Sequence, residues 1–356
     1  MAKVLMKGNE AIALAAVKGG CDAFFGYPIT PQNEVPEYLS KYMNEHGKVF
    51  VQAESEVAAI NMVYGAAGAG ARVLTSSSSP GIALKQEGIT YIAGAQLPCV
   101  ICSVMRGGPG LGSIQPSQGD YNQATRGGGN GDYHVICFAP ETIQETIDTM
   151  KEAFDIADYY RNPVMILVDG LIGQMMESVD FDRPVKHRFL PPKDWAATGT
   201  KNHPGKRNVI NSLYLEPKEL EAHNNMLAKK YALVTQNETR YEMINMEDPD
   251  YVIVAYGTMS RVARSTIEIL KEKKLNVGII RPISLWPFPK IAFDEIGKNC
   301  KGLLVTEMSM GQMIQDVQIS NRGRLPIAFY GRSGGIVPEP EELAEAVMNF
   351  EKWRVE

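Results

Sequence analysis

The feature that most constrains the fold is a regular alternation of short apolar runs with segments of helical periodicity. Six apolar runs in the first half have the length of strands, and they fall at residues 23–26, 48–53, 72–75, 98–104, 133–138 and 164–169. Strands that are separated by helices are joined by crossovers rather than tight turns, so they pair in parallel. The sequence therefore predicts an α/β fold whose first unit is a doubly wound parallel sheet.

Helices are predicted between these strands. The first is expected at residues 9–20, with Asn9 as its N-cap. The Thr30-Pro31 pair is expected to open the second, because threonine caps helices and proline fits a first turn. Residues 105–131 are predicted to form a long glycine-rich loop. Further helices are expected at residues 55–68, 81–93 and 141–160.

The length of the chain and a change of composition near its middle together predict two domains. At 356 residues the chain is too long for one ordinary domain. Between about residues 180 and 211 the pattern dissolves into proline, lysine, arginine and histidine, including His203-Pro204, which is typical of a linker. We therefore expect a first domain at residues 1–180, a linker with a connecting helix at 181–235, and a smaller α/β domain at 236–356.

Composition argues against several classes of protein. The formal net charge is −5 and there is no basic tract, which disfavours nucleic acid as a partner. No apolar stretch has the length of a secretory signal or a membrane span. The 5 cysteines form no framework, which suits a reducing compartment. We expect a cytoplasmic protein with neither membrane nor nucleic acid as a partner.

Cys99 and Cys102 have the spacing of a metal or redox pair. They lie in the apolar run 97–105, which is predicted to be a buried strand. Positions three apart on a strand point to opposite faces, so the two sulfur atoms cannot converge on one metal ion. We therefore predict structural cysteines and no metal site in this chain. The chain also lacks the cysteine run that holds an iron–sulfur cluster, so any cluster is expected on a partner.

Polar segments follow the predicted strands of the first sheet at residues 26–31, 54–56, 76–81 and 105–131. In doubly wound sheets, ligands gather at the C-terminal ends of the strands, where helix N-termini present free N–H groups. The clustering of these four segments predicts a site at that edge.

Each candidate residue also has a simple structural explanation. Thr30 could be only a helix cap, and Glu56 could be only a carboxylate favoured by the helix dipole, with Glu54 competing for any functional role. The serine-rich segment 76–81 could bind an anion or simply connect two elements. Arg106 could bind a carboxylate through two hydrogen bonds or lie on the surface.

A set of motifs in a fixed order adds to this interpretation. They are Gly26-Tyr27-Pro28-Ile29-Thr30-Pro31, residues 54–60, Ser78-Ser79-Pro80-Gly81, Gln118-Gly119-Asp120, and in the second half residues 281–289, residues 307–312 and Gly334-Gly335. Together they resemble the α subunit of 2-oxoacid:ferredoxin oxidoreductases, and most closely the branched-chain (2-oxoisovalerate) type. The resemblance covers essentially the whole chain.

The resemblance implies a fold and a reaction. It implies a thiamine-diphosphate-binding fold with a pyrimidine-type domain followed by a transketolase-C-like domain. The activity implied is oxidative decarboxylation of a branched-chain 2-oxoacid to acyl-CoA and CO2, with electrons passed to ferredoxin.

The resemblance also implies that the active site is shared. Thiamine diphosphate would lie between this chain and a diphosphate-binding β subunit. Mg²⁺ and [4Fe-4S] clusters would be on partner subunits, which include a γ subunit and a ferredoxin-like δ subunit, and coenzyme A would be a co-substrate. The complex would be a dimer of heteromers. The G-D-G…N motif that holds Mg²⁺ is absent from this sequence, in agreement with a split site.

Residue roles follow from the same resemblance. Glu56 matches the glutamate that hydrogen-bonds N1′ of the aminopyrimidine ring, Thr30 the residue that contacts the substrate, and Arg106 an arginine near substrate and cofactor. The cofactor pocket is expected to include Tyr27, Pro28, Ile29, Ser79, Pro80 and Gly81. Many relatives have Thr-Ser-Gly-Pro-Gly where this chain has Ser77-Ser78-Ser79-Pro80-Gly81, and they vary between Arg106 and Gln118, so the preferred substrate stays open.

Three other functions remain as alternatives. One is a relative specific for 2-oxoglutarate, whose second carboxylate would need a further cation in the pocket. Another is a non-catalytic scaffold that keeps the fold without the cofactor. The third is a free-standing transketolase-like enzyme, which the missing diphosphate motif disfavours.

Overall fold

The computed structural model describes residues 3–200, 205 and 207–355. Its first sheet has seven strands in the order β12-β6-β7-β5-β4-β2-β3, all parallel except β12. The central strands β5 and β7 are buried along their whole length, as expected for parallel strands covered on both faces. The strands are β2 (Ala23–Gly26), β3 (Val49–Gln52), β4 (Val73–Ser77), β5 (Cys99–Met105), β6 (Ile136–Phe138), β7 (Pro163–Asp169) and β12 (Ser284–Trp286).

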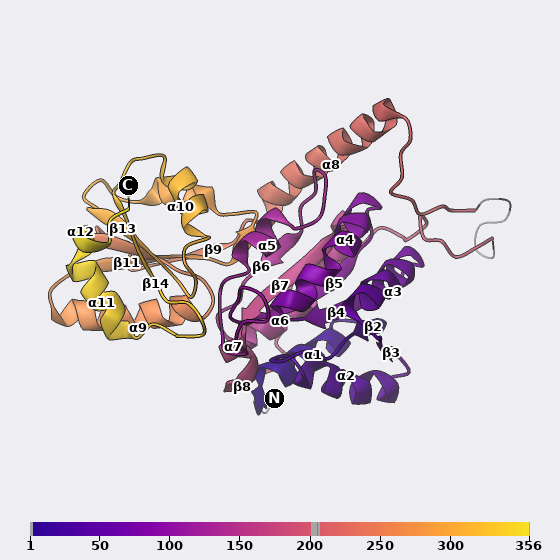
Figure 1. The fold of residues 1–356 in the computed structure, drawn as a ribbon, viewed down its shortest axis with the longest axis horizontal. Coiled ribbons are helices and arrows are strands. Elements are labelled where there is room, and N and C mark those ends of the chain that lie inside the picture. The colour runs from indigo at the N-terminus through magenta and orange to yellow at the C-terminus, as the bar shows by residue number, and fades with distance from the viewer. Residues whose placement is uncertain (1–2, 201–204, 206, 356) are drawn as a thin grey trace.

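Helices cover both faces of this sheet, which confirms the doubly wound prediction (Figure 1). On one face lie α3 (Glu56–Gly68) and α4 (Ser79–Gly94). The opposite face is covered by α1 (Gly8–Lys18), α2 (Glu34–Glu45) and α6 (Ile143–Tyr160). Each helix contributes an apolar stripe to a core layer, so the sheet is sealed from water on both sides.

The two faces separate Cys99 from Cys102, as predicted. Cys99 packs in the layer under α3 and α4, and Cys102 packs in the layer under α1, α2 and α6. Both thiols are free and buried, and burial raises the pKa of each to about 12. No group of acidic, histidine or cysteine side chains that could hold a metal ion occurs among the described residues.

Two predicted helix starts are wrong. The cap of α1 is Lys7, and Asn9 lies inside the helix, where its Nδ2 donates to the Pro31 carbonyl oxygen at 2.7 Å. Thr30 and Pro31 do not open α2, which begins at Glu34. The Pro31 carbonyl oxygen accepts its hydrogen bond from a side chain of α1 and not from a backbone N–H of α2. This tertiary contact overrides the Thr-Pro pattern, which on its own favours a helix start.

Short elements that carry little periodicity were not predicted. They are β1 (Val4–Lys7), which pairs antiparallel with β8 (Met176–Val179), and the short helices α5 (Tyr121–Arg126) and α7 (Gly170–Gln174). The predicted loop 105–131 therefore contains a helix. β12 is also unexpected, because it comes from the second half of the chain and pairs antiparallel with β6 in the first sheet.

The second sheet has five strands in the order β14-β13-β10-β11-β9, with β9 antiparallel at one edge. Its strands are β9 (Tyr241–Ile244), β10 (Tyr251–Val254), β11 (Val277–Pro282), β13 (Gly302–Glu307) and β14 (Ile327–Gly331). Its helical elements are α9 (Thr258–Glu272), η1 (Lys290–Glu295), α10 (Ile314–Asn321), α11 (Pro340–Met348) and α12 (Phe350–Trp353). One apolar layer is continuous from the α3–α4 side of the first sheet to this unit, so the two units pack directly against each other.

Residues 180–216 form no helix or strand where the structure describes them, and residues 201–204 and 206 of the predicted linker lie outside the described residues. The charged helix that follows is α8 (Pro217–Glu238), which extends from the body of the protein in Figure 1. Within the described ranges, no helix is both long enough and apolar enough to cross a membrane.

Candidate functional site at the strand ends

The polar segments that the sequence predicted to meet do lie at one edge of the first sheet. β2, β4 and β5 are neighbours, with β3 beside β2, and all run in the same direction. The loops that follow them, and the first turns of α3 and α4, therefore share that edge.

Arg106 connects three of these segments through hydrogen bonds. Its Nη1 donates to the Thr30 carbonyl oxygen at 2.9 Å, and its backbone N–H donates to Ser79 Oγ at 3.0 Å. Ser79 Oγ in turn lies 2.5 Å from Asp120 Oδ2, to which it donates. Nη2 donates to the Leu111 carbonyl oxygen at 3.0 Å. Arg106 is 8 % exposed, so it is a buried part of this edge and not a surface arginine.

Thr30 lies beside Arg106 without capping α2. Its hydroxyl accepts a long hydrogen bond from Asn33 Nδ2 at 3.3 Å, and its side chain is half-buried. The backbone of Thr30 is fixed by the guanidinium of Arg106, while its hydroxyl keeps a lone pair and a proton available.

Glu56 is the inward-facing carboxyl of the site. It lies in the first turn of α3, whose cap is Ser55, with the Ser55 hydroxyl accepting from the Ala58 N–H at 3.1 Å. Glu56 is only 6 % exposed, whereas Glu54 is exposed. The structure therefore distinguishes the two carboxylates that the sequence left in competition.

Gly81 packs directly against that carboxyl. A Cβ atom at this position would lie 2.7 Å from Glu56 Oε1 and 2.1 Å from Ser77 Oγ. Within the described part of the chain, Ser77 Oγ and Ser78 Oγ are buried and have no hydrogen-bond partner. The Glu56 carboxyl and the unpartnered Ser77 hydroxyl thus both lie against the backbone of Gly81, which carries no side chain.

The remaining residues predicted for the pocket are more exposed than Glu56 and Arg106. Tyr27 is 37 % exposed, Pro28 is exposed, and Ile29 and Pro80 are half-buried. An exposed aromatic ring beside a buried polar site can form one wall of a ligand pocket.

Lys85 belongs to this region and was not predicted. It lies on α4 one turn after Gly81, is 0 % exposed, and donates from Nζ to Thr75 Oγ1 at 2.7 Å and to the Ser76 carbonyl oxygen at 3.1 Å. Burial lowers the pKa of Lys85 to about 7, and the nearby Glu56 opposes that shift. The sequence did carry a signal, because Lys85 lies three residues after Ile82 on the apolar stripe of α4.

Asp120 is the second residue without a predicted role. Burial raises its pKa to about 6, against the opposing effects of the hydrogen bond from Ser79 and the charge of Arg106. The sequence motif contained Asp120, but no local pattern indicates that it lies against Arg106.

Gln118 joins this edge to the second unit. Its backbone N–H donates to the Met308 carbonyl oxygen at 2.9 Å, its Oε1 accepts from the Met308 N–H at 3.0 Å, and its Nε2 donates to the Tyr256 carbonyl oxygen at 2.8 Å. Glu307, which is fully buried, accepts hydrogen bonds from the backbone N–H groups of Gln312, Met313 and Ile314. The second unit therefore helps to fix the loop that carries Asp120.

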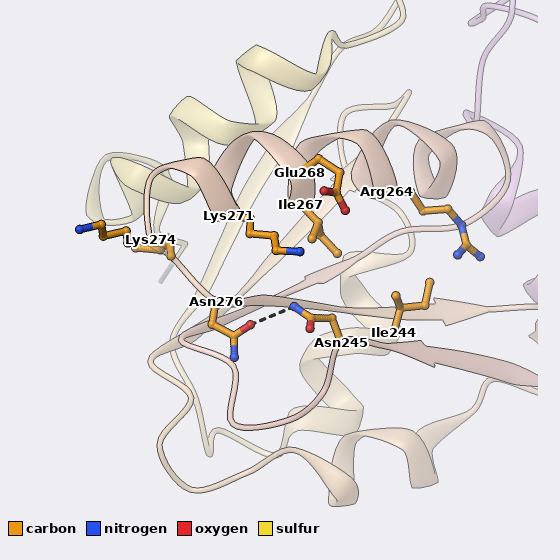
Figure 2. Close-up of a pocket in the computed structure, with 9 residues that line it drawn as sticks. Ile244, Asn245, Arg264, Ile267, Glu268, Lys271, Lys274 and Asn276 are labelled. Carbon is orange, nitrogen blue, oxygen red and sulfur yellow. Dashed lines mark hydrogen bonds between the residues drawn. The ribbon is translucent and has the colours of Figure 1, made fainter.

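A hollow of about 530 Å³ lies elsewhere, between α9 and the β9 edge of the second sheet (Figure 2). Its most buried cation, Arg264, is paired with Glu141 and Glu242, each at 2.7 Å. Lys271 points into it, whereas Lys274 extends away from it, so the two amines do not converge (Figure 2). None of its lining residues belongs to the group around Glu56.

Comparison with known proteins shows the family of the chain. The pyruvate flavodoxin/ferredoxin oxidoreductase thiamine diphosphate-binding domain matches residues 14–248, and the pyruvate:ferredoxin oxidoreductase core domain II matches residues 249–343. The chain belongs to this family of 2-oxoacid oxidoreductases.

Two curated relatives show its place in the family. The ketoisovalerate oxidoreductase subunit VorB of Methanothermobacter thermautotrophicus is 47 % identical, over 98 % of this chain and 97 % of the relative. The 2-oxoglutarate synthase subunit KorA of Archaeoglobus fulgidus is 36 % identical, over 96 % of this chain and 98 % of the relative.

Two solved structures are similar. A 2-oxoglutarate:ferredoxin oxidoreductase from Magnetococcus marinus with 2-oxoglutarate, coenzyme A and succinyl-CoA bound superposes with a TM-score of 0.88 at 27 % identity; the match covers 98 % of this chain and 65 % of the other. A split-gene transketolase, an inactive β4 tetramer, superposes with a TM-score of 0.62 at 15 % identity, over 98 % of this chain and 99 % of the other, and shows the fold alone.

The residues at the strand ends fit the pyrimidine ring of thiamine diphosphate. An aminopyrimidine needs a carboxyl at one ring nitrogen, hydrogen-bonding groups at its edge and an aromatic or apolar wall. Glu56 would provide the carboxyl, Ser77 and Ser78 have hydroxyl groups without partners among the described residues, and Tyr27 is a partly exposed aromatic residue in the loop after β2. The backbone of Gly81 lies against Glu56 because no side chain separates them.

Proposed function

We propose that this chain is the α-type subunit of a branched-chain 2-oxoacid:ferredoxin oxidoreductase. The reaction converts a branched-chain 2-oxoacid and coenzyme A into an acyl-CoA and CO2, and it passes two electrons to ferredoxin. The observation that carries the proposal is Glu56, a buried carboxyl at the start of α3 that packs against the backbone of Gly81 at the C-terminal edge of the sheet.

Glu56 would hydrogen-bond the ring nitrogen N1′ and hold the proton that the two atoms share. When bound, thiamine diphosphate supplies the electron sink that the loss of CO2 requires. A carboxyl at N1′ favours the imino form of the aminopyrimidine, which can then act as a base. The burial of Glu56 excludes water from this contact, so the proton remains between carboxyl and ring.

Arg106 and Thr30 would orient the 2-oxoacid. Arg106 Nε is buried without a partner among the described residues, and its other nitrogens are fixed by carbonyl oxygens. This leaves an N–H group for a substrate carboxylate, which guanidinium groups bind well. The Thr30 hydroxyl, whose backbone carbonyl is held by Arg106, would donate to the substrate carbonyl.

The rest of the active site would come from partner chains. A diphosphate-binding β subunit would hold the diphosphate and Mg²⁺, and the γ subunit and ferredoxin-like δ subunit would complete the electron path with [4Fe-4S] clusters. Coenzyme A would be the acyl acceptor, and the assembly would be a cytoplasmic dimer of heteromers. Two observations support this: similar proteins are named as subunits, and the sequence has no G-D-G…N motif.

The direct test compares Glu56→Gln with Glu54→Gln in the assembled complex. Glutamine keeps the shape of the side chain but cannot share a proton with N1′, so Glu56→Gln should lower kcat by about 10²–10⁴-fold while the complex still assembles. Glu54→Gln changes an exposed carboxylate two residues away and should retain wild-type turnover. Equal turnover of the two variants would overturn the proposed role of Glu56.

The preferred substrate is tested by turnover of 2-oxoisovalerate against 2-oxoglutarate. The proposal for 2-oxoisovalerate rests on the greater similarity to the ketoisovalerate relative, 47 % against 36 % for the 2-oxoglutarate relative from Archaeoglobus fulgidus. A higher kcat/KM for 2-oxoisovalerate supports it, and an equal or higher value for 2-oxoglutarate reverses the choice.

A further inference from the structure

Asp120 occupies a position where its side chain would ordinarily cap a helix. It directly precedes α5, and an aspartate at such a position usually accepts a hydrogen bond from an N–H of the first turn. No such bond forms here. The Asn122 N–H, which a capping carboxylate would take, donates instead to Gln312 Oε1 of the second unit at 2.8 Å. Helix capping therefore does not explain the carboxyl of Asp120.

The carboxyl of Asp120 contacts the hydroxyl of Ser79 instead. Ser79 Oγ lies 2.5 Å from Asp120 Oδ2. The same Ser79 oxygen lies 3.0 Å from the backbone nitrogen of Arg106 and 3.2 Å from the Arg106 carbonyl oxygen. Ser79 and Arg106 are each 8 % exposed, so little water reaches these contacts. Three polar atoms of two other residues thus surround one hydroxyl group.

The number of protons on these groups limits which contacts are hydrogen bonds. A hydroxyl has one proton, the Arg106 N–H can only donate, and the Arg106 carbonyl oxygen can only accept. When Asp120 is ionised it can also only accept, so the single Ser79 proton faces two acceptors. When Asp120 is protonated, it donates to Ser79 Oγ and Ser79 donates to the Arg106 carbonyl oxygen. All three contacts are hydrogen bonds only in the protonated state.

The charged and titratable groups that face Asp120 are few among the residues that the structure describes. Arg106 is the neighbouring cation, and Tyr256 comes from the second unit. Burial raises the pKa of Tyr256 well above its ordinary value, so this residue stays neutral. Burial also raises the pKa of Asp120 to about 6, against the hydrogen bond from Ser79 and the charge of Arg106. The direction of that shift agrees with the proton count.

We propose that Asp120 is a positioning residue that acts through the Ser79 hydroxyl and holds the backbone of Arg106 more firmly when it carries a proton. In the ionised state, Asp120 takes the Ser79 proton from the Arg106 carbonyl oxygen and places a negative charge near the Arg106 cation. The inference rests on the proposed function, because that function assigns Arg106 to the carboxylate of a 2-oxoacid. Asp120 exchanges its proton with solvent and is assigned no contact with the substrate.

The expected consequence is a KM that depends on pH. Ionisation of Asp120 removes one hydrogen bond from the Arg106 backbone and adds a charge of the same sign as the substrate carboxylate. KM for 2-oxoisovalerate should therefore rise about three- to tenfold between about pH 5 and about pH 7.5. The effect should appear in KM more than in kcat, because Asp120 acts on a residue that binds the substrate.

The first test does not depend on activity. Infrared spectra of the full chain are recorded between about pH 4 and about pH 8, and the difference between wild type and Asp120→Asn isolates the Asp120 carboxyl. A protonated-carboxyl band lost near pH 6 is expected. Ser79→Ala should move that midpoint upward, because the ionised carboxyl loses its donor, and Ser79→Thr, which keeps a hydroxyl, should restore it. A band lost near pH 4, as for an ordinary aspartate, or a midpoint unchanged in Ser79→Ala, would overturn the proposal.

The second test measures KM against pH in the assembled complex. In Asp120→Asn the side-chain amide donates to Ser79 Oγ as a protonated carboxyl does, and it cannot ionise. KM of this variant should stay at the low-pH value of the wild type throughout. Asp132→Asn is the matched control, since it removes an exposed carboxylate from the loop after α5 and should keep the wild-type pH dependence. A KM for Asp120→Asn that rises with pH as in the wild type contradicts the role of Asp120.

The two tests also separate this inference from the proposed function. If the infrared midpoint responds to Ser79→Ala but the wild-type complex turns over no 2-oxoacid, the hydrogen-bond arrangement stands and the proposed function fails. If the complex is active and Asp120→Asn behaves as the wild type, the proposed function stands and the role of Asp120 fails.

Discussion

Replacing Gly81 by alanine adds one methyl group at the point where the site is most crowded. The new Cβ would lie 2.1 Å from Ser77 Oγ and 2.7 Å from Glu56 Oε1. An ordinary contact between such atoms is about 3.4 Å, so the methyl group overlaps Ser77 by about 1.3 Å and Glu56 by about 0.7 Å. Relief of both overlaps requires the Ser77 hydroxyl and the Glu56 side chain to move, or the first turn of α4 to shift away from them, and each of these changes displaces the carboxyl relative to the site.

This displacement should affect activity more than stability. A misplacement of about 1 Å at a reacting group can cost about 10²-fold in rate, so kcat/KM of the assembled complex should fall by about 10²-fold, or about 2.7 kcal/mol. Overpacking should cost about 1–3 kcal/mol of folding free energy, partly offset by about 0.5–1 kcal/mol from replacing a helical glycine. The binding of thiamine diphosphate to the complex, followed by calorimetry, should weaken in parallel.

Two other helical glycines separate crowding from chemistry. No atom lies within 4 Å of a Cβ at Gly65 on α3, so Gly65→Ala should stabilise the protein by about 0.5–1 kcal/mol and leave kcat/KM unchanged. A Cβ at Gly88 would lie 2.5 Å from Ile60 Cγ2, so Gly88→Ala should destabilise the fold without touching the carboxyl. If Gly81→Ala kept kcat/KM within about twofold of wild type, Glu56 would not be held where the proposed chemistry needs it.

Three further outcomes follow from buried polar groups. Glu307→Gln should lower the free energy of unfolding by about 2 kcal/mol and speed amide exchange at Gln312, because the charged acceptor of three backbone N–H groups is lost. Burial raises the pKa of Asp120 from 3.8 to about 6, so the wild type should lose stability as pH rises through that range; thermal midpoints of Asp120→Asn should lack this loss. All 5 cysteines are buried, and iodoacetamide should therefore label the folded chain far more slowly than the chain in urea, as intact mass would show.

The parts of the fold that could be predicted are those encoded by local pattern. The central strands are short apolar runs, and the start of α3 is given by a serine cap followed by a small-residue helix. These signals depend only on residues close in sequence, so they survive into the structure. For the same reason Glu56 could be placed at a helix start at the sheet edge, and the structure adds Ser55 as the cap of that helix.

The parts that could not be predicted depend on contacts between distant segments. Thr30 and Pro31 have the local pattern of a helix start, but the Pro31 carbonyl is taken by Asn9 Nδ2 at 2.7 Å and Gln174 Nε2 at 3.1 Å. Those two bonds hold the segment as a turn before α2. β12 joins the first sheet only because the second unit packs against it, and no property of three residues in isolation could indicate that pairing.

Lys85 shows how such a distant contact can still leave a trace in the sequence. On α4 it takes a place on the inward stripe between Ile82 and Ile89, where an apolar residue would give a better core. An ammonium in that position lowers stability unless its N–H groups find acceptors, and here the acceptors are Thr75 Oγ1 at 2.7 Å and the Ser76 carbonyl oxygen at 3.1 Å. Both belong to β4, and only the packing of α4 against that strand brings them to Lys85. The polar exception to an apolar pattern could be seen in advance, whereas its hydrogen-bond partners could be named only once the helix and the strand were placed.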